Sequence, residues 1–123
     1  MEGPIKPRVP AKVFVILNEL LAHDERLAQL MKTTWKPNAA IPTLWLAITD
    51  WRLLLFSTRQ DRSLFKKVPF GEIDTIRVEH GKVIEVLMND VHLGDLRIPI
   101  APEYRHLVSD SVRGVNSHLK HGS

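Results

Sequence analysis

The residues of this chain that could take part in acid–base or nucleophilic chemistry lie close together near the C-terminus. His106 and Asp110 are four positions apart in a helical pattern, and Ser109 and Ser111 lie beside them. A Ser-His-Asp site needs a nucleophile that points at its base, together with an oxyanion hole. Adjacent residues of one helix point in different directions, and the sequence has no nucleophile-elbow turn. We therefore predict that the protein is not an enzyme.

Metal and cofactor sites are not expected either. The chain has no cysteine, which rules out disulfides and thiolate ligands. His118 and His121 are three positions apart, but no carboxylate accompanies them, and the glycines are too isolated to form a phosphate-binding loop. We predict no metal, no cofactor and no small-molecule substrate.

Positive charge is concentrated between Arg52 and Lys67. This segment holds five basic residues against the single Asp61, whereas the whole chain has a net charge of only +3. Such a segment can contact anionic lipid headgroups, although basic residues also occur on solvated strand edges, where they deter aggregation. The overall charge is too small for a dedicated nucleic-acid-binding protein. The candidate contacts for an anionic ligand are Arg59, Arg62, Lys66, Lys67 and Lys36.

Trp35 is the candidate contact for a partner protein or a membrane. It stands beside Lys36 and Pro37, and the amphipathic indole ring is suited to anchoring at such a surface. A tryptophan at the end of a strand can instead cap the core. The sequence leaves both roles open.

Two helices and seven strands must position these residues. The chain of 123 residues is 44% hydrophobic and 25% charged, as expected of one globular domain. Residues 1–9 are rich in proline and predict a flexible arm before a single domain over residues 10–123. Within it we expect a helix at about 10–23, strands within about 26–100 and a C-terminal helix at about 102–120. With no signal peptide and no apolar run long enough to cross a bilayer, we expect a cytoplasmic protein.

Two details of this pattern remain ambiguous. Residues 25–35 fit either a continued helix or a first strand, because Leu30 and Met31 suit the one and Thr33 the other. Tight turns link nearly all the strands and predict an antiparallel sheet that curls into a barrel, with the C-terminal helix at its open end. Gly114 weakens that helix by about 1 kcal/mol relative to alanine, so we expect the helix to approach the sheet closely there.

Two segments carry a resemblance to a known family. Residues 46–56 fit the pattern Leu-x-x-Thr-Asn/Asp-x-Arg-Leu, and residues 68–76 are similar to Ile-Pro-Tyr-x-x-Ile-x-x-Ile, with Asp24 and Glu25 as a weaker match. Through these segments the chain resembles the bacterial pleckstrin-homology-like domains, which are related to GRAM domains, over residues 24 to 118. The motif positions are Thr49, Asp50, Arg52, Phe56, Pro69 and Ile73.

These motif residues also have a physical explanation of their own. The side-chain oxygens of Thr49 and Asp50 can accept backbone N–H groups in a tight turn. The guanidinium of Arg52, just after the turn, can reach a carboxylate or exposed carbonyl groups at the rim of the barrel.

The resemblance implies an α+β, mainly β fold: a seven-stranded antiparallel barrel capped by a C-terminal helix, here with an additional N-terminal helix. It also implies a binding or scaffold module that contacts a protein partner or forms a homo-oligomer. Relatives that bind phosphoinositides carry clustered basic residues between the first two strands, where this chain has only Lys36. The alternative function is peripheral binding to anionic membranes through the Arg59–Lys67 hairpin. The N-terminal helix could pack on its own barrel or on a neighbour.

Overall fold

The computed structural model describes residues 9–35, 43–59, 64–90 and 94–121. The predicted N-terminal arm therefore lies almost entirely outside the described residues. Two helices, α1 (Ala11–Leu20) and α2 (Arg105–His121), begin and end the fold, and two 3-10 turns, η1 (Phe70–Glu72) and η2 (Pro102–Tyr104), precede β5 and α2. The strands are β1 (Leu27–Lys32), β2 (Trp45–Thr49), β3 (Arg52–Phe56), β4 (Leu64–Pro69), β5 (Ile73–His80), β6 (Ile84–Asp90) and β7 (Gly94–Pro99).

The seven strands form two antiparallel sheets and not the closed barrel that we expected. One sheet has the order β1-β2-β3-β4 and the other β5-β6-β7. The chain leaves the first sheet at Pro69, which has no backbone N–H to donate, and η1 then redirects it into β5. An isolated antiparallel bridge between Thr33, just after β1, and Ile100, just after β7, joins the two sheets. The mainly β fold with a helix at each end is confirmed, but the barrel was wrong.

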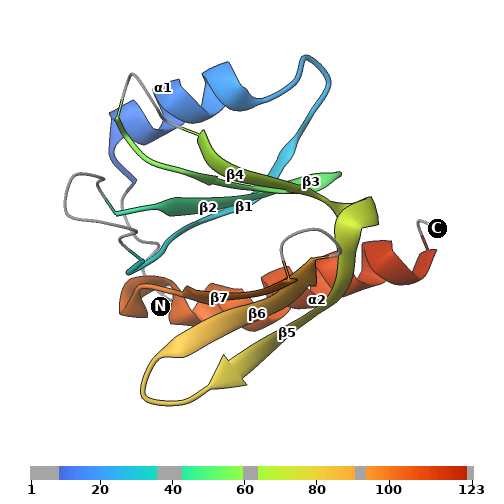
Figure 1. Cartoon of the computed structure of the whole chain (residues 1–123). Helices are drawn as coiled ribbons and strands as arrows, with labels where there is room; N and C mark the ends of the chain where they lie inside the picture. The colour runs from blue at the N-terminus through green and yellow to red at the C-terminus, as the bar shows by residue number, and fades with distance from the viewer. Residues whose placement is uncertain (1–8, 36–42, 60–63, 91–93, 122–123) are drawn as a thin grey trace, which may run out of the picture.

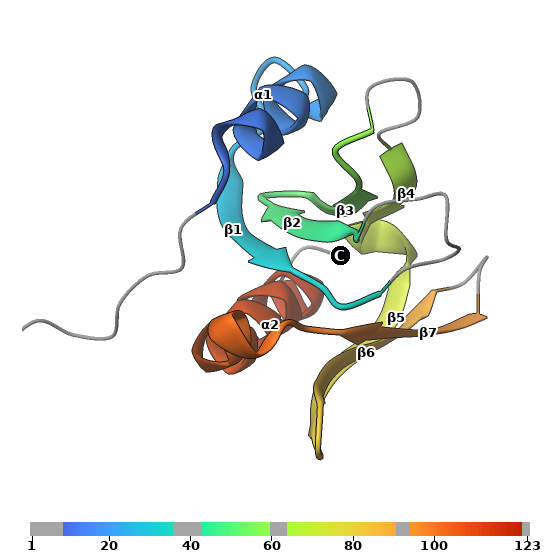
Figure 2. The same cartoon turned by 90° about the vertical axis from the view of Figure 1, so that its left-hand side faces the viewer.

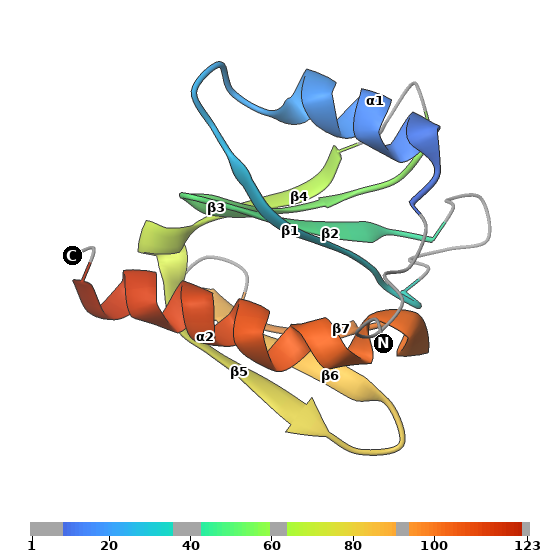
Figure 3. The ribbon, with the colours of Figure 1, turned by 180° about the vertical axis from the view of Figure 1, so that it is seen from behind.

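The helix α1 packs on its own domain. It lies on one side of the four-stranded sheet, while the three-stranded sheet and α2 lie on the other (Figures 1 and 3). Val13, Ile16 and Leu17 of α1 are buried, and so is every residue of β2. The strands β2 and β3 are therefore core strands covered on both faces, which explains their nearly continuous apolar sequence.

The ambiguous segment 25–35 forms a strand over most of its length. β1 pairs with β2 from Leu27 opposite Thr49 to Lys32 opposite Trp45, and Figure 2 shows it running between the two helices. Leu30 and Met31 are both buried although they are neighbours. Because β1 buries residues on both of its faces, its apolar spacing resembles that of a helix.

The C-terminal helix and the 3-10 turn before it bury one stripe of apolar residues. The Tyr104 ring, in η2, meets Trp45 edge-to-face with 6.0 Å between the ring centroids, and Asn116 Nδ2 donates a hydrogen bond of 3.1 Å to the Ile76 carbonyl of β5. None of the helices in the described ranges has the length and apolar character needed to cross a membrane. The buried positions of the stripe are Tyr104, Val108, Val112 and Val115.

Gly114 faces open space, so the close approach that we expected at this position was wrong. It is exposed, and a Cβ atom added to it would meet no neighbouring heavy atom within 4 Å. Gly114→Ala is expected to raise the free energy of unfolding by about 0.5–1 kcal/mol, because alanine favours the helix and restricts the unfolded chain. Thermal unfolding followed by circular dichroism measures this as a Tm a few degrees higher. An unchanged or lower Tm would mean that the glycine is needed for helix packing.

Candidate binding surface

The motif residue Arg52 forms a bidentate ion pair with Glu25. Arg52 Nε donates to Glu25 Oε2 and Nη2 donates to Oε1, both at 2.8 Å. The same Nη2 also donates to the Leu20 carbonyl at the end of α1, at 3.1 Å. The Glu25 side chain is completely buried and that of Arg52 is 12% exposed. The prediction that Arg52 reaches a carboxylate or an exposed carbonyl is confirmed, and it reaches one of each.

Two further donors complete the surroundings of this carboxylate. Thr49 Oγ1 donates to Glu25 Oε2 at 2.6 Å, and the Ala22 N–H donates to Oε1 at 2.9 Å. Thr49 Oγ1 also accepts the Arg52 N–H at 3.1 Å, as expected of a turn residue. Burial alone would raise the pKa of Glu25. The hydrogen bonds from Arg52, Thr49 and Ala22, with the charge of Arg52, outweigh burial and hold that pKa below its ordinary value of 4.5.

The remaining motif residues also serve turns and packing. Asp50 Oδ1 accepts the Arg26 N–H at 3.2 Å, which holds the β2–β3 turn against the start of β1. Phe56 and Ile73 belong to the core, and Pro69 lies opposite Arg52 where β4 ends. The motif therefore ties α1, β1 and the β2–β3 turn together, and its carboxylate is fully occupied by partners within the chain.

A different group of residues forms the candidate contact surface. Trp35, at the end of the first strand segment, meets Phe65 of β4 edge-to-face, with 5.5 Å between ring centroids. Lys66 Nζ lies 5.2 Å from the centroid of the Phe65 ring. Both rings are partly buried against the core, whereas Leu64 is 39% exposed. We call Trp35, Leu64, Phe65 and Lys66 the aromatic–basic surface.

Phe65 is not among the contact residues predicted from the sequence, and a β-bulge explains why. Lys66 lies opposite Leu55 and Leu64 lies opposite Phe56, so Phe65 is an extra residue with no partner on β3. A bulge re-aims the side chains around it. Simple alternation along β4 separates Phe65 from Lys66, and no residue type in the segment signals the bulge.

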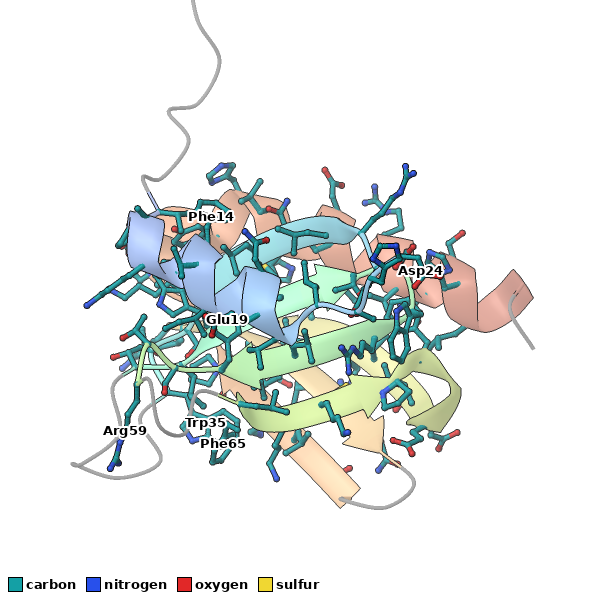
Figure 4. All side chains as sticks on the ribbon, turned by 90° about the horizontal axis from the view of Figure 1, so that it is seen from above. Phe14, Glu19, Asp24, Trp35, Arg59 and Phe65 are labelled. Atoms are coloured by element: carbon teal, nitrogen blue, oxygen red, sulfur yellow. The ribbon has the colours of Figure 1, made fainter. Side chains whose placement is uncertain are left out.

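The structure divides the predicted basic residues instead of gathering them. Lys67 is exposed and lies opposite Leu54, one position along from Lys66 and therefore on the other face of β4. Figure 4 shows Arg59 at the same end of the molecule as Trp35 and Phe65. The two remaining candidates lie outside the described residues, namely Arg62 and Lys36.

Two of the C-terminal residues that resemble a catalytic group, Asp110 and Ser111, have partners on their own helix. Asp110 pairs with Arg113 at 3.0 Å, and Ser111 Oγ donates to the Leu107 carbonyl at 2.7 Å. Across the described ranges, no three His, Asp or Glu side chains come together in a way that could hold a metal ion. Asp110 and Ser111 therefore make hydrogen bonds and ion pairs within α2.

Comparison of the chain with protein-family models, with curated proteins and with solved structures gives no match. The geometry alone defines a mainly β domain of two antiparallel sheets with one helix at each end of the chain. The contact between the aromatic rings of Trp35 and Phe65 joins the end of the first strand region to β4 at the surface of this domain.

Proposed function

We propose that this chain is a non-enzymatic, pleckstrin-homology-like binding module, and that it contacts a protein partner through the aromatic–basic surface. Seven antiparallel strands followed by a C-terminal helix are what the family resemblance implies. The motif residues Thr49 and Arg52, on which the resemblance depends, both donate hydrogen bonds to the buried Glu25, which supports the same family. The partner would be another protein or a second copy of this chain.

The contact between Trp35 and Phe65 carries this proposal. It joins two segments that are thirty positions apart in the sequence and adds a lysine at one ring face. Aromatic and cationic side chains are enriched where protein interfaces gain most of their affinity. Because both rings already pack against the core, little side-chain freedom is lost when a partner binds. A partner that offers carboxylates around an apolar contact would complement this surface.

The shifted pKa values also favour a binding module over an enzyme. The carboxylate of Glu25 has a lowered pKa, but it is held by Arg52, Thr49 and Ala22. Burial, with a smaller effect of the Glu103 charge, raises the pKa of Tyr104, whose ring packs against Trp45. Catalytic acids and bases usually need a perturbed pKa together with access to a substrate. Both of these groups serve the interior of the fold.

Site-specific photo-crosslinking tests the surface directly. A photoreactive amino acid at Leu64, which is 39% exposed, is expected to give a discrete crosslinked product in cells that make the protein. A product of twice the 14.1 kDa chain mass identifies a second copy, and any other discrete mass identifies a different protein. Lys66→Glu in the same chain should reduce the yield several-fold, because it reverses the charge beside the Phe65 ring.

Val15 provides the matched control position. It is 58% exposed on α1, and α1 lies on the far side of the four-stranded sheet from the second sheet (Figure 1). The same photoreactive group at Val15 should give no discrete product. Equal products from Leu64 and Val15, or a product from Val15 alone, would contradict the proposed surface.

Peripheral binding to an anionic membrane is the second candidate function. Lys66 and Lys67 favour it, because each basic residue near an anionic membrane contributes about 1 kcal/mol. Their positions on opposite faces of β4 make it the weaker candidate. Co-sedimentation with phosphatidylserine vesicles that falls as salt rises, and that is lost in Lys66→Gln/Lys67→Gln, would favour the membrane over the protein partner.

A further inference from the structure

A second feature of the molecule, separate from the aromatic–basic surface, is a cleft beside the β5–β6 hairpin. Residues of this hairpin, of the start of α2 and of the segment just after β1 line the cleft. These segments lie toward the same end of the fold (Figures 1 and 3). Its volume is about 180 Å³, and its apolar wall includes Ile84 and Ile100. Its polar lining includes Thr34, His80, Lys82 and Arg105, all of them exposed residues.

The charge in this cleft is positive and lacks an internal counter-charge. Lys82 and Arg105 line it, and no Asp or Glu does so. In the part of the chain that the structure describes, neither of these cations has an ion-pair partner, whereas Arg97 pairs with Glu85. Two unpaired cations that border one cavity repel each other unless an anion lies between them.

The position of Arg105 strengthens this argument. It is the first residue of α2, and the first turn of that helix contains no acidic residue. The positive end of the helix dipole disfavours a cation at this position. Glu103, in the preceding 3-10 turn, is exposed and does not line the cleft. An anion in the cleft would compensate both the helix dipole and the two basic side chains.

We propose that this cleft binds a phosphate group, held by Lys82 and Arg105 with Thr34 and His80 as further hydrogen-bonding groups. A guanidinium and an ammonium are the side chains that recognise phosphate oxygens in proteins. The apolar wall and the exposed Val83 at the hairpin tip suit a phosphate that is attached to an organic body. A lipid headgroup and a soluble phosphate compound share this chemistry.

Amide chemical shifts of the full chain, followed during titration with inorganic phosphate at constant ionic strength, test the site. We expect saturable shifts at Gly81, Lys82 and Arg105. The double variant Lys82→Gln/Arg105→Gln should weaken the dissociation constant by about tenfold or more, because it removes two charge-assisted hydrogen-bonding partners. Arg113→Gln, on the same helix but outside the cleft, should bind as the wild type does.

Vesicles distinguish the two sources of phosphate. Binding to phosphatidylcholine vesicles that contain phosphatidic acid, lost in the double variant and absent when phosphatidylserine supplies the same charge, identifies a lipid headgroup. Saturable binding of inorganic phosphate without vesicle binding identifies a soluble ligand. The proposal is overturned if neither probe gives binding that depends on Lys82 and Arg105, or if phosphatidylserine vesicles bind equally well.

Discussion

Replacing Arg52 by methionine is expected to lower the free energy of unfolding by about 3–5 kcal/mol. The substitution removes the partner of a carboxylate that is completely buried, and an uncompensated buried charge is among the most costly single changes in a protein. It also leaves the Leu20 carbonyl without this donor at the end of α1. Urea denaturation at neutral pH, followed by circular dichroism, measures the loss.

Two controls separate the cost of the unpaired charge from the value of the ion pair. Glu25→Met/Arg52→Met removes both charges and should recover much of the loss, because apolar replacements of a buried pair are often tolerated. Arg97→Met breaks an ion pair whose arginine is 56% exposed, and should cost less than about 1 kcal/mol. A double variant as unstable as Arg52→Met alone would show that Thr49 and Ala22, not the charge balance, determine the effect.

The same variant should respond to pH in a defined direction. The pKa of Glu25 is lower in the folded protein than its ordinary value of 4.5, so the folded state holds fewer protons than the unfolded state between those two values. The stability that this group contributes is therefore complete above about pH 4.5 and is lost as the pH falls through the folded pKa. The difference in stability between wild type and Arg52→Met should shrink in that acidic range. A difference that stays constant would contradict the ion-pair explanation.

Leu17→Ala is expected to destabilise the protein by about 2–5 kcal/mol, the second largest effect. Leu17 is 1% exposed on the face of α1 that packs on the domain, so its truncation creates a cavity between the helix and the rest of the core. Val15→Ala, on the exposed face of the same helix, is the matched control and should change the stability by no more than about 0.5 kcal/mol. Thermal and urea unfolding of both variants measure the difference.

The comparison decides whether α1 belongs to the fold. If Leu17→Ala and Val15→Ala are equally mild, α1 contributes little to the stability of the domain and would be available to another molecule. If Leu17→Ala alone lowers the free energy of unfolding by several kcal/mol, α1 is an integral part of the fold that covers the four-stranded sheet.

Local sequence patterns predicted the helices and strands, but they did not predict that the strands form two separate sheets instead of one closed barrel. Alternation and turn residues predicted the strands, and helical spacing predicted α2, because those signals are local. Burial on both faces of β1 hid the strand character of Leu30 and Met31. Whether a sheet closes depends on pairing between distant strands, and η1 interrupts that pairing after Pro69.

The candidate sites depended still more on distant contacts. The sequence predicted that Arg52 binds an acceptor but not which one. Glu25 lies twenty-seven positions away, and the neighbouring Asp24 was an equally plausible partner. The contact between Trp35 and Phe65 needs a bulge that no residue type marks. The cleft lined by Lys82 and Arg105 joins a hairpin to a helix, and neither residue is unusual in its own segment.

The break between the two sheets has a consequence for how the chain finds its fold. Every paired strand is the sequence neighbour of its partner, and the two sheets are built from residues 27–69 and 73–99. Each sheet therefore closes by pairing consecutive strands, with residues 33–44 as the longest connection. Such sequence-local pairing costs less chain entropy than pairing of distant strands and favours rapid folding. The long-range step is the docking of the halves, through the bridge from Thr33 to Ile100. Because the second sheet and α2 cover one face of the first sheet (Figure 1), that apolar face of β2 and β3 stays exposed until the C-terminal half has been made and has docked.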